Sequence, residues 1–192
     1  MLHRLYARMI EIAAGPRAEA TLAAVAFIES SFFPIPPDVL LIPMILARPR
    51  AAWRLAALCT LASVAGGMLG YAIGYFLFDA IGRPLLEFYG AMDRYWALKA
   101  GFDQWGVWII ILKGMTPIPY KLVTIASGVA HFDLVAFVAA SIVSRSLRFF
   151  LLAALLWWFG DAARAFIERR LMLVTTVFAV LLVGGFVALR YL

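Results

Sequence analysis

The chain has 192 residues, of which 65% are hydrophobic, and its mean hydropathy is +0.94. Soluble domains use roughly 45–50% apolar residues, so this composition excludes an ordinary water-soluble domain. The formal net charge of +6 would suit a nucleic-acid binder, but the arginines stand beside apolar stretches, which favours membrane topology and anionic lipid as their role. We therefore expect a multi-pass integral membrane protein that does not bind nucleic acid.

Two elements are predicted before residue 50. Residues 1–19 alternate charged and apolar side chains, which predicts an interfacial helix, although a solvated leader helix explains the pattern equally well. Residues 20–47 form two apolar stretches, each too short to cross about 30 Å of hydrocarbon. They are separated by Pro34, Pro36 and Pro37, and proline breaks a helix by removing a backbone donor. This pattern predicts a re-entrant helical hairpin whose tip is covered by protein.

The first predicted transmembrane helix covers residues 55–82. Gly66, Gly70 and Gly74 recur at every fourth position of this stretch and therefore share one helix face. A glycine face lets two helix backbones approach closely, so we expect another helix to pack there. Residues 83–103 mix charged and aromatic side chains, which indicates an amphipathic connector at a membrane surface.

The second half of the chain repeats this order. Residues 105–130 hold two short apolar stretches separated by Pro117 and Pro119, which predicts a second re-entrant hairpin. Residues 134–160 are predicted to span the membrane, residues 161–170 to form a polar joint, and residues 171–189 to be a C-terminal transmembrane helix.

The expected fold is all-α and contains an internal repeat. Each of the two repeated units consists of a re-entrant hairpin followed by a transmembrane helix. A hairpin returns to the side from which it enters, so the single span between the two hairpins inverts the second unit. Arginine is richer on the side that holds the N-terminus. The positive-inside rule therefore places the N-terminus in the cytoplasm and the C-terminus outside.

Six charged residues fall within the predicted membrane depth, where ionisable side chains are costly and indicate function. They are Glu29, Asp38, Lys113, Lys121, Arg145 and Arg148. One interpretation is structural: the charges form ion pairs that hold the two repeats together, for example Asp38 with Lys121. The other is functional: acids of one repeat and bases of the other surround a polar cavity that binds a phosphate. Both predict close approach of the acids to the bases.

Individual roles follow from position and chemistry. Arg145 and Arg148 are three residues apart, which places them on one helix face where they can grip a headgroup together. Glu29 or Asp38 could exchange protons during transport. For Lys113 the alternative is that its side chain extends to the membrane surface and binds no ligand. Neither histidine has a second histidine at ligand spacing, so the sequence predicts no metal site and no cofactor.

Four motifs carry a resemblance to a known family. They are FIESSFFPIPPD at 27–38, the glycine stretch at 66–74, KGMTPIPYK at 113–121 and SRSLRF at 144–149. Over residues 20–165 the chain resembles the DedA family, also called the VTT or SNARE-associated Golgi protein family, and within it the YqaA-like branch.

This resemblance implies an inner-membrane protein with two opposed re-entrant hairpins. It also implies a role in envelope maintenance and in moving phospholipids or undecaprenyl phosphate between leaflets. Essential acids and bases of the family match Glu29, Asp38, Lys113 and Lys121 by motif.

The leading hypothesis is a transporter or scramblase of a lipid phosphate, passive or proton-coupled. In it Lys113, Lys121, Arg145 and Arg148 hold the headgroup, while Glu29 and Asp38 gate the path or relay protons. The rivals are a non-transporting membrane scaffold and an intramembrane lipid-modifying enzyme. An enzyme would need a nucleophile set or metal ligands, which the sequence does not show. Membrane lipids are the expected partners, and homo-oligomer formation stays open.

Overall fold

All secondary structure in the described part of the chain is helical. The computed structural model describes residues 17–31, 36–90, 92–115 and 120–169. Its α-helices are α2 (Ala18–Ser31), α3 (Asp38–Ala47), α4 (Ala52–Leu77), α5 (Arg83–Phe88), α6 (Met92–Met115), α7 (Tyr120–Val129) and α8 (Leu134–Arg169). A 3-10 turn, η1 (Pro49–Ala51), precedes α4, and a π-helical segment, η2 (Phe78–Gly82), follows it. The predicted C-terminal helix at 171–189 and most of the predicted N-terminal helix at 1–19 lie outside the described residues.

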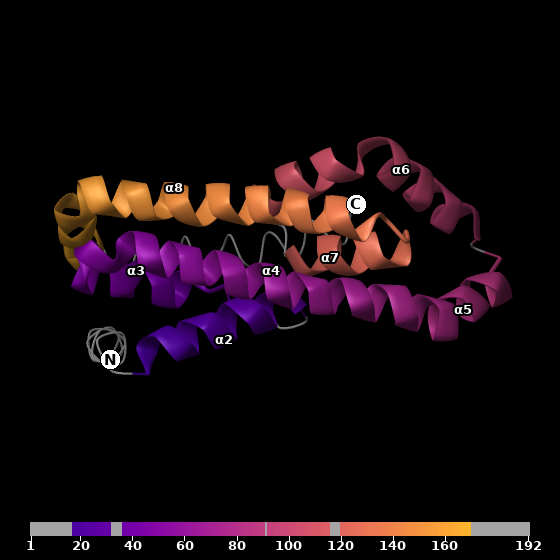
Figure 1. Cartoon of the computed structure of the whole chain (residues 1–192), viewed down its shortest axis with the longest axis horizontal. Coiled ribbons are helices and arrows are strands. Elements are labelled where there is room, and N and C mark those ends of the chain that lie inside the picture. The colour runs from indigo at the N-terminus through magenta and orange to yellow at the C-terminus, as the bar shows by residue number, and fades with distance from the viewer. Residues whose placement is uncertain (1–16, 32–35, 91, 116–119, 170–192) are drawn as a thin grey trace.

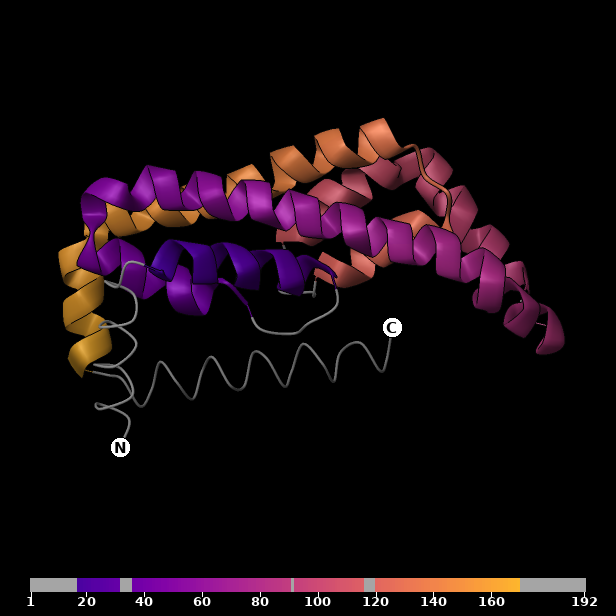
Figure 2. The ribbon, with the colours of Figure 1, turned by 60° about the horizontal axis from the view of Figure 1, so that its bottom comes forward.

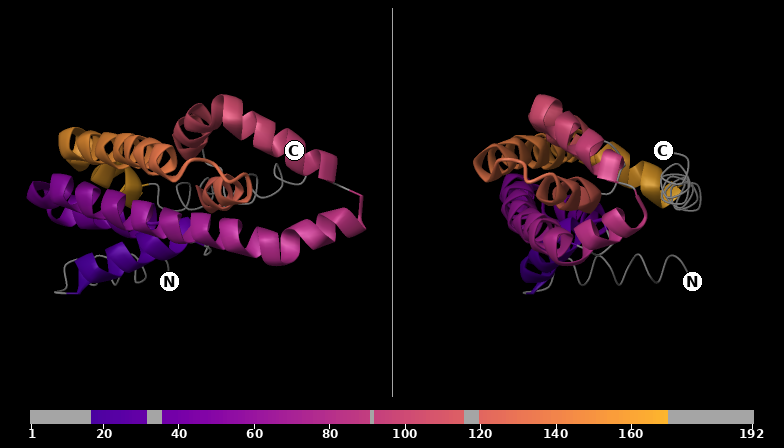
Figure 3. Two further views of the ribbon diagram at one scale, coloured as in Figure 1. Left: turned by 45° about the vertical axis from the view of Figure 1, so that its right-hand side comes forward. Right: turned by 90° about the vertical axis from the view of Figure 1, so that its right-hand side faces the viewer.

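Two long helices form the frame of the molecule. Figure 1 shows α4 running along its length, with α8 beside it in the opposite direction, and Figure 3 shows the same pairing from another side. Two stretches are long and apolar enough to cross a membrane among the described residues, Pro49–Phe88 and Leu134–Gly160. The second coincides with the predicted span at 134–160, and the first contains the predicted span at 55–82 and extends beyond it at both ends. Beyond the second span α8 continues through a kink at Phe159 to Arg169, within the predicted polar joint.

Shorter helices flank the two halves of α4. In Figures 1 and 2, α2 leads toward the middle of the molecule and α3 leads back to the end where α2 began. From the opposite end, α6 leads in and α7 leads back. Pro36 and Pro37 lie between α2 and α3, whereas Pro34, Pro117 and Pro119 lie outside the described residues. The described helices thus end before each predicted proline cluster and begin again after it. The inverted-repeat relation itself stays a prediction.

The predicted connector differs from the observed structure. Residues 83–103 were expected to form one amphipathic element separate from the hairpin that follows. Instead α5 ends at Phe88, and α6 runs without a break from Met92 to Met115, so it joins most of the connector to the first arm of the second hairpin. The physical reason is that residues 92–115 contain no proline, while Gly101 and Gly106 are tolerated inside a helix.

The glycine face of α4 packs against two helices, as predicted. A Cβ atom added to Gly66 would collide with the backbone oxygen of Phe27 in α2, and one added to Gly74 would collide with that of Ile125 in α7. Gly70 faces both helices, through Ser30 and Thr124. Only glycine permits such backbone contact, so the prediction of close helix packing at Gly66, Gly70 and Gly74 is confirmed.

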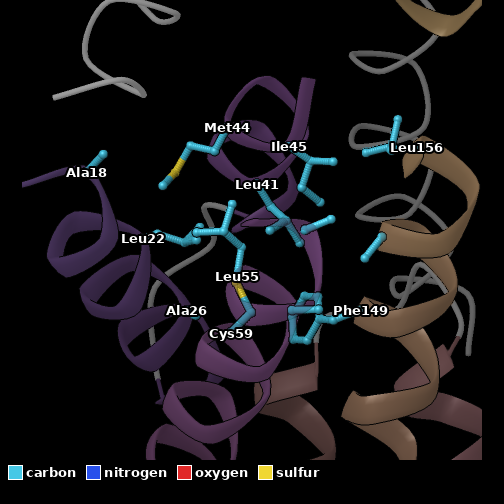
Figure 4. Close-up of a cluster of buried hydrophobic side chains, with 13 residues drawn as sticks. Ala18, Leu22, Ala26, Leu41, Met44, Ile45, Leu55, Cys59, Phe149 and Leu156 are labelled. Atoms are coloured by element: carbon cyan, nitrogen blue, oxygen red, sulfur yellow. The ribbon is translucent and has the colours of Figure 1, made fainter. Parts of the chain in front are cut away.

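Two hydrophobic clusters form the core of the described structure. The first joins α2, α3, α4 and α8 and includes Leu22, Leu41, Leu55 and Phe149 (Figure 4). The second joins α4, α6, α7 and α8; its members are Tyr71, Ile110, Tyr120, Val123, Phe137 and Ala140. Arg145 contacts aromatic rings of both clusters, so charged and polar groups lie between two apolar layers.

Candidate functional site

Arg145 is a buried cation at the centre of the described structure. It projects from α8 near the middle of the span Leu134–Gly160, and its side chain is only 2% exposed. One guanidinium nitrogen, Nη2, donates to Oε2 of Glu29 at 3.1 Å, and Nε donates to Oγ of Ser63 at 2.6 Å. The guanidinium carbon lies 4.5 Å from the ring centre of Tyr120 and 4.8 Å from that of Phe149. Ionic, hydrogen-bonding and cation–π contacts therefore all stabilise the buried charge.

Hydrogen bonds between small polar residues extend this site across the helices. The hydroxyl oxygens of Ser30 and Ser63 lie 2.5 Å apart, and Ser30 also donates to Glu29 at 3.1 Å. In α7, Thr124 donates to the backbone oxygen of Ser30 at 3.2 Å, which connects α7 to the end of α2. We call the set Glu29, Ser30, Ser63 and Arg145 the central polar cluster. It joins α2, α4 and α8 close to the glycine face, at which the backbone of α4 meets α2 and α7.

A second ion pair lies one helical turn along α8. Nη2 of Arg148 donates to Oδ2 of Asp38 at 2.5 Å. This pair is more open than the first, because the Arg148 side chain is 29% exposed and that of Asp38 is 18% exposed. The other carboxylate oxygen, Oδ1 of Asp38, is buried without a hydrogen-bond partner among the described residues. Asp38 is the first residue of α3, where the helix dipole favours a negative charge.

The sequence prediction that the acids approach the bases closely is confirmed for four of the six residues. Glu29 pairs with Arg145 and Asp38 with Arg148. The observed partner of Asp38 is thus a residue of α8, whereas the example given from sequence was Lys121 in the second hairpin. Lys113 is exposed on α6 and Lys121 is half-buried on α7, and both side chains have partners. Arg145 and Arg148 share a helix side, but each holds a different acid.

Two members of the site were missed at the sequence level. Ser63 is buried and contacts both Ser30 and Arg145; it precedes Gly66 by three residues and therefore shares the glycine face, which could have revealed it. Tyr120 stacks on Arg145 and donates to Ser141 at 2.5 Å, but a tyrosine beside a proline motif carries no signal of a cation–π contact. Its role depends on how α7 meets α8.

The arrangement can hold charge in a low-dielectric environment. Arg145 is enclosed, so it cannot accept an added ligand without displacing Glu29 or Ser63. Arg148 is partly exposed and contacts a carboxylate that has one oxygen without a hydrogen-bond partner among the described residues, so a phosphate could compete for Arg148. Among the described residues no group of three or more His, Cys, Asp or Glu side chains is placed to hold a metal ion.

Comparisons with known proteins agree with the resemblance found from the sequence. The family model described as the VTT domain matches residues 35–157. An uncharacterized protein of Haemophilus influenzae is 37% identical over 169 residues, which cover 88% of each chain. Another uncharacterized protein, from Histophilus somni, is 34% identical over 156 residues, which cover 81% of each chain.

No solved structure matches the chain. The family model covers more than half of the chain, and the relatives cover most of it. VTT-domain proteins are membrane proteins, and two described helices are long and apolar enough to cross a bilayer. The chain is therefore a membrane protein of the VTT domain family, also known as the DedA or SNARE-associated family, with bacterial homologues.

Proposed function

We propose that this protein moves a lipid phosphate, such as undecaprenyl phosphate or a phospholipid, between the leaflets of the bacterial inner membrane. In this proposal it acts as a transporter or scramblase and not as an enzyme. In it the two hairpins form an inverted repeat around the charged residues that lie inside the membrane. A lipid headgroup moves past these residues while its acyl chains stay in the hydrocarbon. The observation that carries the proposal is the half-open ion pair between Asp38 and Arg148.

This ion pair has the properties of an exchangeable site. Arg148 is partly exposed, so a headgroup can reach it, and a guanidinium binds phosphate through two parallel hydrogen bonds. Asp38 has a buried oxygen with no hydrogen-bond partner among the described residues, so its carboxylate is not fully stabilised. A phosphate that displaces Asp38 from Arg148 would leave this carboxylate to take up a proton. That exchange gives the proposal its link to proton coupling.

The central polar cluster has a different role in this proposal. Arg145 is enclosed by Glu29, Ser63 and two aromatic rings, which makes it a fixed cation that attracts phosphate without leaving its place. Removing either partner of such a pair leaves an uncompensated buried charge. Lys113 and Lys121, on the second hairpin, would supply the positive charge along the remaining path. Their positions on α6 and α7 support this assignment.

A leaflet-exchange assay tests the proposal. The purified protein is reconstituted into liposomes that contain a fluorescent phosphatidylglycerol, and dithionite then destroys the fluorescence of the outer leaflet. Wild-type protein is expected to expose the inner leaflet as well, so that fluorescence falls beyond the outer-leaflet fraction. Arg148→Gln is expected to stop this further loss, because glutamine has no charge to bind the phosphate. The matched control is Arg83→Gln, an exposed arginine at the end of the molecule.

A charge reversal separates the headgroup site from a simple ion pair. The double variant Asp38→Arg with Arg148→Asp keeps one positive and one negative side chain at the same two positions. A purely structural pair tolerates this exchange, whereas a headgroup site loses the positive charge that α8 provides. We expect a folded protein that no longer moves lipid. Lipid movement at the wild-type rate in the reversed variant would contradict the proposal.

The second candidate function is a non-transporting scaffold, and one observation favours it. All the contacts of Arg145 described above are internal, as expected for a charge that only holds helices together. In a scaffold the Arg148 pair would also be structural, and Arg148→Gln would lower stability. The same variant therefore decides between the two functions. Loss of lipid movement in Arg148→Gln at an unchanged melting temperature supports transport. A lowered melting temperature of Arg148→Gln, together with a wild-type protein that moves no lipid, supports the scaffold.

A further inference from the structure

Three arginines surround a pocket far from the central polar cluster. The pocket lies where α3 ends and α4 begins, at the end of the molecule marked by the α3 label in Figure 1. It has a volume of about 720 Å³ and is open to the surface. The residues that line it are Ala47, Arg48, Pro49, Arg50, Ala51 and Arg54. Three of the six residues that line the pocket are therefore arginines, each with a guanidinium group.

The pocket already binds a carboxylate oxygen from within the chain. Oε1 of Glu19, in the first turn of α2, lies 2.5 Å from Nη2 of Arg54 and 3.7 Å from Nη1 of Arg48. Arg50 is exposed beside them. Glu19 thus pairs with Arg54 and Arg48, whereas Arg50 makes no ion pair among the described residues, so its positive charge is available for a second anion. The two non-bridging oxygens of a phosphodiester match the planar guanidinium as a carboxylate does.

Aromatic side chains place this pocket at the level of the lipid headgroups. Trp53 neighbours Arg54 in the first turn of α4 and is 44% exposed. Its ring stacks on Phe150 at 6.1 Å and lies 6.4 Å from the ring of Trp157, which is also exposed. Exposed tryptophans gather at the boundary between hydrocarbon and headgroups. The arginines at the same end of the span therefore meet phosphates and not acyl chains.

We propose that the pocket formed by Arg48, Arg50 and Arg54 binds the phosphate of an anionic phospholipid headgroup. The site lies at the entrance end of the α4 span and is separate from the Arg148 pair, so it does not depend on the proposed function. Glu19 acts as an internal competitor that occupies two of the arginines when no lipid is bound. Phosphatidylglycerol provides the required chemistry, a single negative phosphate attached to acyl chains that lie against the exposed tryptophans.

The test measures lipid binding to the purified full-length protein by native mass spectrometry in detergent. Phosphatidylglycerol, phosphatidylcholine and soluble glycerol phosphate are the three probes. We expect a tight phosphatidylglycerol adduct on the wild-type protein, which Arg50→Gln weakens about fivefold, the factor that one basic side chain contributes at an anionic surface. Arg50 is exposed, and its substitution leaves the contacts of Glu19 intact. The control, Arg83→Gln, removes the same charge from a residue paired with Glu87 and leaves binding unchanged.

Glu19→Gln provides the sharper comparison. If Glu19 competes with the headgroup, its neutralisation strengthens phosphatidylglycerol binding, although it removes two ion pairs from the protein. If the arginines serve only to bind Glu19, the variant gains no lipid affinity, and this result overturns the proposal. Equal binding of phosphatidylcholine would show that the pocket does not select a net negative headgroup, and equal binding of glycerol phosphate would show that a lipid is not required. Either result also overturns it.

Discussion

At the scale of single residues, the pair between Glu29 and Arg145 determines how a charge can stay inside this protein. The Glu29 side chain is 13% exposed and that of Arg145 is 2% exposed, so water screens their attraction little. Desolvation of both groups nevertheless offsets much of that attraction. The pair as a whole is therefore a modest source of stability, whereas either partner left alone is a large cost.

Glu29→Gln is expected to destabilise the folded protein by about 3–5 kcal/mol, because it leaves the guanidinium of Arg145 buried without a counter-charge. The measurement is reversible unfolding of the purified protein in mixed micelles. Glu87→Gln is the matched control, since Glu87 is paired with Arg83 at an exposed position and such pairs contribute about 0–1 kcal/mol. Equal losses in the two variants would show that the buried pair is screened like a surface pair.

At the scale of helices, backbone contact at the glycine face holds α4 against α2 and α7. A methyl group at Gly66 or Gly74 meets a backbone oxygen, and a backbone cannot move aside without displacing its whole helix. Gly128 of α7 makes the reciprocal contact, since a Cβ atom there would meet the backbone of Tyr71 in α4. Close approach of α4 and α7 thus depends on glycines from both helices.

Gly66→Ala and Gly74→Ala are expected to destabilise the protein by roughly 1–3 kcal/mol, the usual cost of overpacking. Gly101→Ala is the control, because apart from its own helix backbone no atom of the described residues lies within 4 Å of its added Cβ, and alanine favours a helix. This control should stabilise α6 by about 0.5–1 kcal/mol. Thermal unfolding of the three variants in one detergent gives the comparison. Stabilisation by all three substitutions would contradict close packing at the glycine face.

Hydropathy and proline positions were sufficient to predict the spans and the helix breaks, because both depend on short stretches of sequence. The glycine spacing also predicted close packing, although it could not name α2 and α7 as the partners. The ion-pair partners of residues far apart in the sequence were harder to predict. The choice of Arg148 as the partner of Asp38 depends on where α3 meets α8, and a pattern of charges along the chain does not contain that distance. The unbroken α6 was missed because charged residues resemble a surface element even when the helix continues.

At the scale of the whole molecule, the two ends of the α4 span differ in charge. Arg48, Arg50 and Arg54 lie at its beginning, whereas Asp79 and Glu87 lie with Arg83 at its end. The 26 residues of α4 extend about 39 Å at roughly 1.5 Å per residue, enough to cross the hydrocarbon with some tilt. Basic residues are retained on the cytoplasmic side of bacterial membranes. The beginning of α4 is therefore expected to face the cytoplasm.

Cysteine labelling in a bacterial inner membrane tests this orientation. Cys59 is the single cysteine of the chain and is buried in α4, so Cys59→Ala provides a background without reactive thiols. Added to that background, Arg50→Cys should react with a membrane-impermeant maleimide in inside-out vesicles and not in intact spheroplasts. Glu87→Cys should show the reverse pattern, because α4 carries the chain across the bilayer between the two positions. Labelling of both thiols from one side would refute the crossing, and the opposite pattern at both would refute only the orientation.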